Sequence, residues 1–147
     1  IESKVVTSIG GTLTVPTSAW TPIVFATEYD DLNSDYSTAT GIFTVPEYGF
    51  YSLYANIQAM GYYPHTSYSL RFDIDGVKYA ARTMYSSNRL EDTTLPYNGV
   101  LNLDIFLSSI SIAVSSPIFV EIYQNSGISL DVANSTDTRF EVTRIRA

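Results

Sequence analysis

Short runs of alternating apolar and polar residues recur along this chain of 147 residues. Each run has a large apolar side chain at every second position, and the clearest are Tyr68/Leu70/Phe72/Ile74, Ile118/Val120/Ile122 and Ile128/Leu130/Val132. A period of two residues predicts strands with one buried face. Turn signals separate the runs at Asp75-Gly76, Asn98-Gly99 and Asn125-Ser126-Gly127. No window of ten residues shows an apolar helical stripe, so the sequence predicts an all-β domain.

Residues 41–54 are predicted to hold two strands joined at a corner. Pro46 has no amide donor and is expected to close the first strand. Gly49 is expected to adopt the positive φ that a tight corner needs. The second strand alternates, with Tyr51, Leu53, Ala55 and Ile57 on one face and Phe50, Ser52, Tyr54 and Asn56 on the other.

Together with Asn33, Asp35 and Tyr36 just upstream, this segment resembles the signature of the C1q/tumour-necrosis-factor (TNF) superfamily. That signature has an asparagine, a tyrosine, then glycine, any residue and phenylalanine, and finally proline, glycine, any residue and tyrosine. Weaker matches in the family's order extend the resemblance over roughly residues 20–145, at 20–25, 68–76, 101–103, 117–123 and 139–142.

The resemblance implies a jelly-roll β-sandwich that assembles as a compact homotrimer, usually as the globular head of a fibrous protein. The sequence departs from the family at two places. Residues 104–116 replace a short Gly-Asp turn, and we expect a hairpin over 107–116. Glu141 stands where many relatives carry a small residue.

The length predicts a single domain. Residues 1–19 are expected to form an N-terminal lead-in segment or short strand, and residues 20–147 the C1q/TNF-like jelly-roll domain. Because the chain begins with Ile1 rather than methionine, we expect a fragment or processed product whose stalk, shaft or signal is missing.

The charge and the residue types restrict the partners. A net charge of −7 with scattered basic residues argues against nucleic acid, which needs clustered Lys and Arg. No apolar run reaches 18 residues, so membrane insertion is not expected. The chain has no cysteine, and its stability must therefore come from the core, from oligomerisation or from both.

Four aromatic residues occupy strand positions that a two-layer sandwich would leave in water: Phe50, Tyr54, Phe119 and Tyr123. The resemblance implies that their two strands are neighbours in the sheet that faces the three-fold axis. These residues are therefore predicted to form the trimer interface. The alternative is that loops cover the four rings within one subunit.

Catalysis is not predicted. The single histidine, His65, lies in a loop-like stretch, and neither a nucleophile elbow nor a cysteine is present. Oxygen-rich segments at 30–35 and 73–76 leave a structural calcium ion as an alternative, but neither is a complete EF-hand loop. No cofactor and no metal ligand are assigned.

Aromatic residues in predicted loops are the candidates for ligand binding, because tyrosine offers a flat apolar face and a hydroxyl group. They are Tyr62, Tyr63, Tyr85 and Tyr97, with His65 beside them. We therefore predict a non-enzymatic trimeric head of an extracellular or virion-surface fibre, which attaches to a host glycan or protein. The absence of cysteine, the Ser/Thr/Tyr-rich composition and the segment Tyr123-Gln124-Asn125-Ser126-Gly127 look more like heads of phage or bacterial surface fibres than like vertebrate complement proteins. The alternatives are a monomeric carbohydrate-binding module and a capsid or decoration protein.

Overall fold

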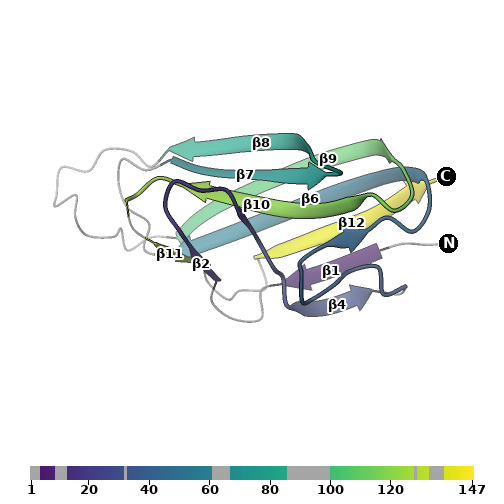
Figure 1. Ribbon diagram of the computed structural model, residues 1–147, viewed down its shortest axis with the longest axis horizontal. Helices are drawn as coiled ribbons and strands as arrows, with labels where there is room; N and C mark the ends of the chain where they lie inside the picture. Colours follow the sequence, from purple (N-terminus) through teal and green to yellow (C-terminus); the bar gives the residue numbers. More distant parts are fainter. Residues whose placement is uncertain are drawn as a thin grey trace.

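The computed structural model describes residues 4–8, 13–31, 33–60, 67–85, 100–127, 129–132 and 138–147. These residues form twelve strands and no helix, and the strands pair antiparallel in two sheets (Figure 1). The seven-stranded sheet has the order β2 (Leu13–Val15), β11 (Leu130–Val132), β6 (Gly49–Met60), β12 (Arg139–Arg146), β1 (Lys4–Ser8) and β4 (Thr27–Asp31), and β9 (Val100–Ile112) also pairs with β6. The five-stranded sheet has the order β3 (Thr21–Pro22), β10 (Pro117–Gln124), β7 (Ser67–Ile74) and β8 (Val77–Tyr85), and β5 (Phe43–Thr44) also pairs with β10. Within the described ranges no helix has the length and apolarity needed to cross a bilayer.

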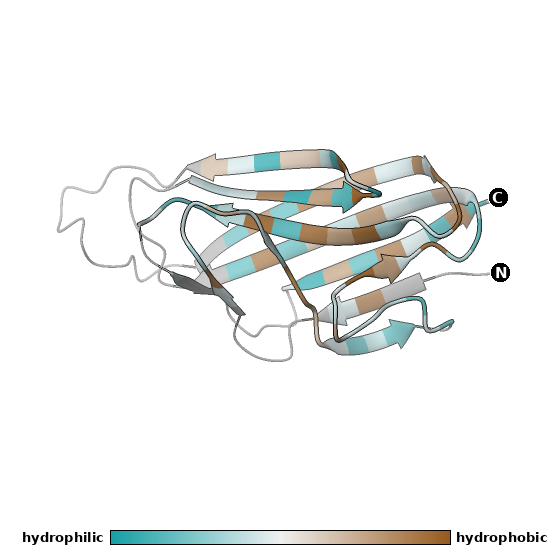
Figure 2. Ribbon diagram, in the orientation of Figure 1, coloured by the Kyte–Doolittle hydropathy of each residue, from teal (hydrophilic) through white to brown (hydrophobic). Residues whose placement is uncertain are grey.

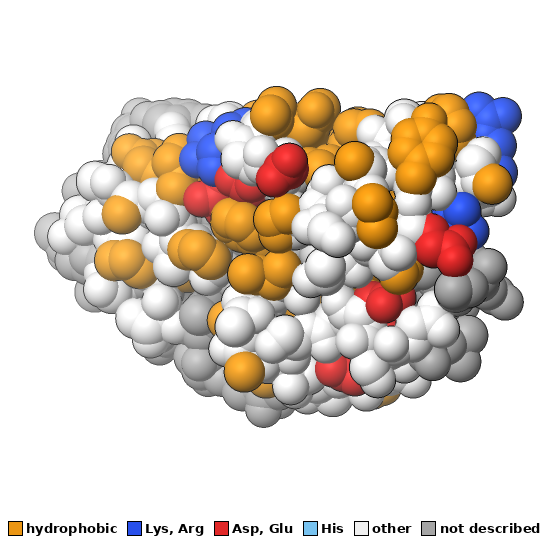
Figure 3. Space-filling model, turned by 45° about the vertical axis from the view of Figure 1, so that its right-hand side comes forward, with side chains coloured by type: hydrophobic (Ala, Val, Ile, Leu, Met, Phe, Trp, Pro, Cys, Tyr) orange, Lys and Arg blue, Asp and Glu red, His pale blue; other side chains and the backbone are white. Residues whose placement is uncertain are grey.

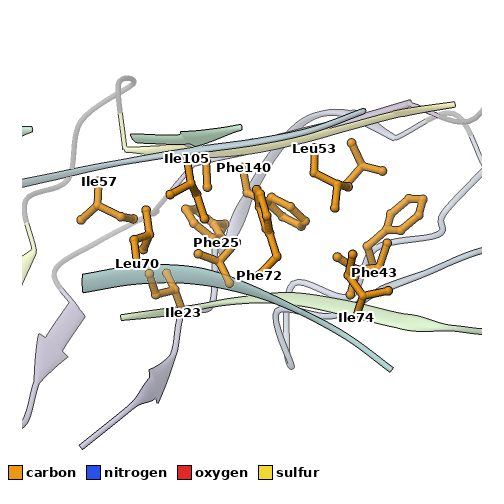
Figure 4. Packing of buried hydrophobic residues seen from close by; sticks show 14 of the residues in the cluster. Ile23, Phe25, Phe43, Leu53, Ile57, Leu70, Phe72, Ile74, Ile105 and Phe140 are labelled. Carbon is orange, nitrogen blue, oxygen red and sulfur yellow. The ribbon is translucent and has the colours of Figure 1, made fainter. Parts of the chain in front are cut away.

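The core lies between the two sheets, where side chains from both layers meet (Figure 4). Phe140 of β12 is central: its ring centroid lies 5.8 Å from that of Phe25 and 6.2 Å from that of Phe72. The alternation of apolar and polar residues along the strands is visible in Figure 2. Burial of these rings removes large apolar areas from water and supplies the main driving force for folding.

The inward sets predicted on three strands are confirmed. Buried side chains lie at every second position of β6, β7 and β10, namely Tyr51, Leu53, Ala55, Ile57, Tyr68, Leu70, Phe72, Ile74, Ile118, Val120 and Ile122. The predicted turn is present too, because Asp75 and Gly76 both have positive φ between β7 and β8. Of the third predicted run, Ile128 and the side chains of β11 lie outside the described residues.

The conformation predicted for Gly49 is wrong. Positive φ occurs instead at Gly41, Gly76 and Gly127 among the described glycines, and Gly49 is the first residue of β6. A Cβ atom at Gly49 would lie 2.6 Å from Nε of Arg144 and 2.7 Å from the carbonyl oxygen of Arg146. Glycine is needed there because β12 approaches closely, and not because the chain reverses.

The hairpin predicted over 107–116 is wrong as well. Strand β9 continues to Ile112, paired with β6 from Met60↔Val100 to Gly49↔Ile112, and the turn follows at Ala113–Ser116. The register shifts between Tyr51 and Leu53, opposite the positive-φ residue Ser109. Before this bulge the buried positions of β9 are odd-numbered, as Ile105 is, and after it they are even-numbered, as Ile112 is. One continuous strand therefore looks like two in the sequence.

The first nineteen residues contribute strands to the seven-stranded sheet. Strand β1 lies between β12 and β4, and β2 pairs with β11. Lys4 is opposite Thr143, which places the start of β1 near the end of β12. Strand β4 is an edge of this sheet, and its pairing with β1 shifts register between Val6 and Thr7.

Tyr36 fixes the segment between β4 and β5 through a buried hydroxyl group. This oxygen accepts the Phe25 amide at 2.9 Å and donates to the Phe25 carbonyl at 2.9 Å. The side chain is 5% exposed, and burial raises the pKa of Tyr36 to about 12 from 10.0.

A folded-state pKa above the unfolded value means that Tyr36 stabilises the fold fully below about pH 10 and loses this contribution as the pH rises toward 12. We expect the free energy of unfolding to fall by about 2–3 kcal/mol over that interval through this group. Denaturant unfolding at pH 9, 10, 11 and 12 would measure it. Tyr36→Phe is the control, because the other tyrosines titrate in both proteins. An equal fall in both proteins would contradict the assignment.

Candidate functional site

The four aromatic residues predicted to share one interface lie on two opposite faces of the sandwich. Phe50 and Tyr54 belong to β6 of the seven-stranded sheet, whereas Phe119 and Tyr123 belong to β10 of the five-stranded sheet. The prediction that these strands are neighbours is wrong. Alternation shows which residues of a strand share a face, but it does not show which sheet contains the strand.

The outward face of β1, β12, β6 and β9 is called here the Tyr54 face. The strand registers align Val6, Glu141, Tyr54 and Phe106 in one row across it. Phe106 is 61% exposed, and Tyr54 is half-buried. The guanidinium of Arg139 lies 5.6 Å from the centre of the Tyr54 ring and 3.7 Å from the Glu141 carboxylate.

Phe50 lies nearer the end of the Tyr54 face and is covered by its own subunit. Its ring meets Tyr48 edge to face at 6.5 Å, and the guanidinium of Arg146 lies 4.2 Å above it. Arg144 supports this corner by bonding to Glu47 at 3.1 Å and to the Tyr48 carbonyl at 2.8 Å. For Phe50 these contacts therefore favour the alternative that the ring is covered within its own subunit and not by a second one.

An open groove of about 390 Å³ lies between β8 and β9, where the edges of the two sheets come together. Its lining residues are Ala80, Ala81, Arg82, Asp104, Ile105 and Phe106. Arg82 and Asp104 form an exposed ion pair between the two strands. The sequence alone does not indicate this groove, because it predicts an insertion at residues 104–116 and not a continuous strand.

The outward face of β10, β7 and β8, with Trp20 just before β3, is called here the Trp20 face. Lys78 binds the carboxylates of Asp73 and Glu121, the latter at 2.8 Å, and Arg71 binds Glu121 at 3.1 Å. Hydrogen bonds to Asp73 and Glu121 raise the pKa of the Lys78 ammonium above its ordinary value.

Aromatic rings extend this network. The Arg71 guanidinium lies 3.6 Å above the Trp20 ring, whose centre is 5.5 Å from that of Tyr123. The ammonium of Lys78 lies 6.0 Å from the centre of the Phe119 ring. Figure 3 draws one side of the molecule, where basic and acidic side chains lie together among separate groups of apolar ones.

The ligand candidates from the sequence fall largely outside the described residues. Tyr62, Tyr63, His65 and Tyr97 lie in the ranges 61–66 and 86–99, and Tyr85 ends β8 with its backbone alone described. Their roles stay predictions. The strands that these ranges connect are described: β6 and β8 end, and β7 and β9 begin, at the same end of the sandwich (Figure 1).

In each of the two oxygen-rich segments one carboxylate binds groups of the same chain. The oxygens of Asp31 accept the amides of Asp35 and Tyr36 at 3.0 and 3.1 Å. Asp73 accepts the Gly76 amide at 2.9 Å in addition to binding Lys78. Among the described residues no three His, Cys, Asp or Glu side chains gather as a metal site would require.

No protein-family model matches this chain, and no curated protein does. Solved structures do. TNF Eiger from S. frugiperda superposes with a TM-score of 0.65 at 13% identity, over 99% of this chain and 92% of that one. The globular domain of zebrafish complement 1qA gives 0.62 at 14% identity over the whole of both chains. Murine APRIL gives 0.64 at 10% identity, over 99% of this chain and all of that one.

These similarities, with two antiparallel sheets packed face to face, define a jelly-roll sandwich of the C1q/TNF type. The fold prediction is thereby confirmed. The identities of 10–14% establish the fold alone.

Proposed function

We propose that this chain is a non-enzymatic, homotrimeric head domain of an extracellular or virion-surface fibre, and that it attaches the fibre to a host glycan or protein. The observation that best supports assembly is the row of side chains on the Tyr54 face. A phenylalanine that is 61% exposed, beside a half-buried tyrosine, is an apolar surface that a second subunit can cover.

The energetics of this face favour association. Full burial of an aromatic side chain contributes roughly 1.5–3 kcal/mol, and a closed trimer repeats that gain in each subunit. The neighbouring charges, Arg139 and Glu141, are already within 3.7 Å of one another. A paired charge enters an interface at a smaller desolvation cost than a lone one, so the Glu141 departure from the family pattern is compatible with a buried face.

The start of β1 and the end of β12 lie at one end of the sandwich, and the strand ends that the segments 61–66 and 86–99 connect lie at the other (Figure 1). Phe50, at the start of β6, is opposite Arg146, and Lys4 of β1 is opposite Thr143. Met60, at the far end of β6, is roughly 35 Å away along the strand. A stalk joined to β1 would leave free the end where the segments 61–66 and 86–99 connect the strands.

The three carboxylates that are held most firmly in the fold do not favour acid–base catalysis. Asp73 and Glu121 each bind a cation, and Asp31 accepts two backbone amides. An acid–base pair needs groups that are free to exchange protons with a substrate.

Light scattering is the test of assembly. The protein at micromolar concentration should scatter as about three times the 16.3 kDa of one chain. A mass near one chain that does not change with concentration would contradict the trimer and would favour a monomeric carbohydrate-binding module.

Surface plasmon resonance against glycans or envelope extracts is the test of attachment. We expect the trimer to bind more tightly than a monomeric variant by roughly 10²–10⁴, because linked sites raise avidity. Tyr63→Ala and Tyr85→Ala should weaken binding and leave the trimer intact. No binding by the trimer, or equal binding by monomer and trimer, would favour a capsid or decoration role. Indifference to both substitutions would remove these two tyrosines from the attachment site.

A further inference from the structure

Two carboxylates are buried on the outward side of the five-stranded sheet, where side chains normally contact water. Asp73 and Glu121 are 4% and 7% exposed. The two cations that bind them are nearer the surface, since the side chain of Lys78 is 40% exposed and that of Arg71 is 19% exposed. Within this network of four charges the two positive ones are therefore outermost, although the whole chain carries a net charge of −7.

Stability alone is a weak reason for this network. A buried ion pair often contributes no more than well-packed apolar residues of the same size, because both charges lose their hydration. The network does hold Lys78 and Arg71 in fixed positions. An anion that binds them would restrict little further side-chain motion, and such preorganisation increases affinity.

The aromatic residues complete a mixed surface beside these cations. Trp20 and Tyr123 are both half-buried, and their rings are inclined at 39° to each other. The Arg71 guanidinium covers one face of the Trp20 ring at 3.6 Å, so the apolar contact for a ligand is the remaining exposed part of the two rings. Each ring also has one polar group, the indole N–H or the phenol O–H. A sugar ring that carries an acidic group needs this combination: a partner for its C–H face, hydrogen-bonding groups and a cation.

We propose that the Trp20 face binds an acidic saccharide, carboxylated or sulfated, with the sugar against Trp20 and Tyr123 and the anionic group at Lys78 and Arg71. The proposal rests on the attachment role above and assigns it a site other than the loop tyrosines. One fixed pair of cations matches a single anionic group. An extended polyphosphate would meet the net negative charge of the chain and is not a suitable ligand.

Trp20 is the only tryptophan of the chain, so its fluorescence reports on this face directly. The whole protein is titrated with three oligosaccharides of equal length: one that carries a single uronic acid, one that carries a single sulfate group and one that is neutral. We expect a saturable change in emission with one or both acidic sugars, and binding of the neutral sugar weaker by about tenfold or more. The two acidic arms distinguish a carboxylate ligand from a sulfate ligand.

Lys78→Gln and Arg82→Gln form a matched pair, because each removes one positive charge and only Lys78 lies on the Trp20 face. Lys78→Gln should weaken binding of the acidic sugar by about tenfold, and Arg82→Gln by less than about twofold. If Lys78→Gln does not fold, acrylamide quenching of Trp20 fluorescence in the unmodified protein tests whether the sugar covers this face. The acidic sugar should shield it, and the neutral sugar should not.

Light scattering on the same samples separates this proposal from the proposed function. A trimer whose Trp20 responds equally to all three sugars, or to none, overturns the saccharide site and leaves the trimeric head. Equal losses in Lys78→Gln and Arg82→Gln, or binding of glycans that depends on Tyr63 alone, overturn it in the same way. A monomer that binds the acidic sugar with the predicted selectivity supports the site and contradicts the trimer.

Discussion

Tyr54→Glu should convert the proposed trimer into single subunits that scatter light as 16.3 kDa. The new carboxylate would stand in the row between Glu141 and Phe106, where Arg139 is already within 3.7 Å of Glu141. Burial of a charge without a partner costs several kcal/mol, and 1.4 kcal/mol is a tenfold change in an equilibrium constant. Association should therefore weaken by at least roughly a hundredfold at each contact.

Tyr123→Glu is the matched control for this experiment. It makes the same chemical change on the opposite face of the sandwich, beside Trp20. We expect this variant to remain a trimer. A monomer from Tyr123→Glu together with a trimer from Tyr54→Glu would show that the subunits meet through the five-stranded sheet.

Gly41→Ala should lower the free energy of unfolding by about 2–5 kcal/mol, from two causes. Gly41 has a φ of +76°, a region that costs an L-residue about 1–2 kcal/mol. Its added Cβ would also lie 2.6 Å from the carbonyl oxygen of Ile23 and 3.0 Å from the Cα of Val24. These are backbone atoms, so relief requires movement of the chain beside the buried Ile23, and such overpacking costs about 1–3 kcal/mol.

Gly76→Ala isolates the conformational part of that loss. Gly76 has a φ of +84°, but its Cβ would meet no atom within 4 Å. Denaturant unfolding of both variants should show a loss of about 1–2 kcal/mol for Gly76→Ala and a clearly larger loss for Gly41→Ala. Equal losses would mean that the contact with Ile23 has no energetic effect.

The strands and their buried faces could be predicted from the sequence, because burial of one face imposes a period of two on the side chains. Tyr51, Leu53 and Ala55 illustrate this, and the sequence Asp75-Gly76 gave the hairpin turn correctly. The assignment of strands to sheets could not be predicted, because pairing depends on contacts between distant residues. For that reason the prediction that Tyr54 and Tyr123 share one face is wrong.

Irregular backbone explains why other features could not be predicted from the sequence. The bulge opposite the start of β6 breaks the alternation of β9, so the sequence does not mark Phe106 as part of the candidate interface. The Trp20 face was missed for a related reason. Arg71 and Glu121 are fifty residues apart and meet only because β7 and β10 pair in that register. Charged residues at outward positions of two apolar strands were the available signal, but a single sequence does not reveal the register.

The acidic edge of the seven-stranded sheet has a consequence for how copies of this chain can combine. Strand β4 pairs with β1 alone among the described strands, and it carries Glu28, Asp30 and Asp31 beside a shift in register. Another copy that added a strand there would bring like charges together along a distorted ladder, which opposes continuous growth of the sheet. Another copy can still make contacts through the side chains on the broad faces of the sandwich. At this edge the chain is thus protected from the strand-by-strand pairing that builds filaments.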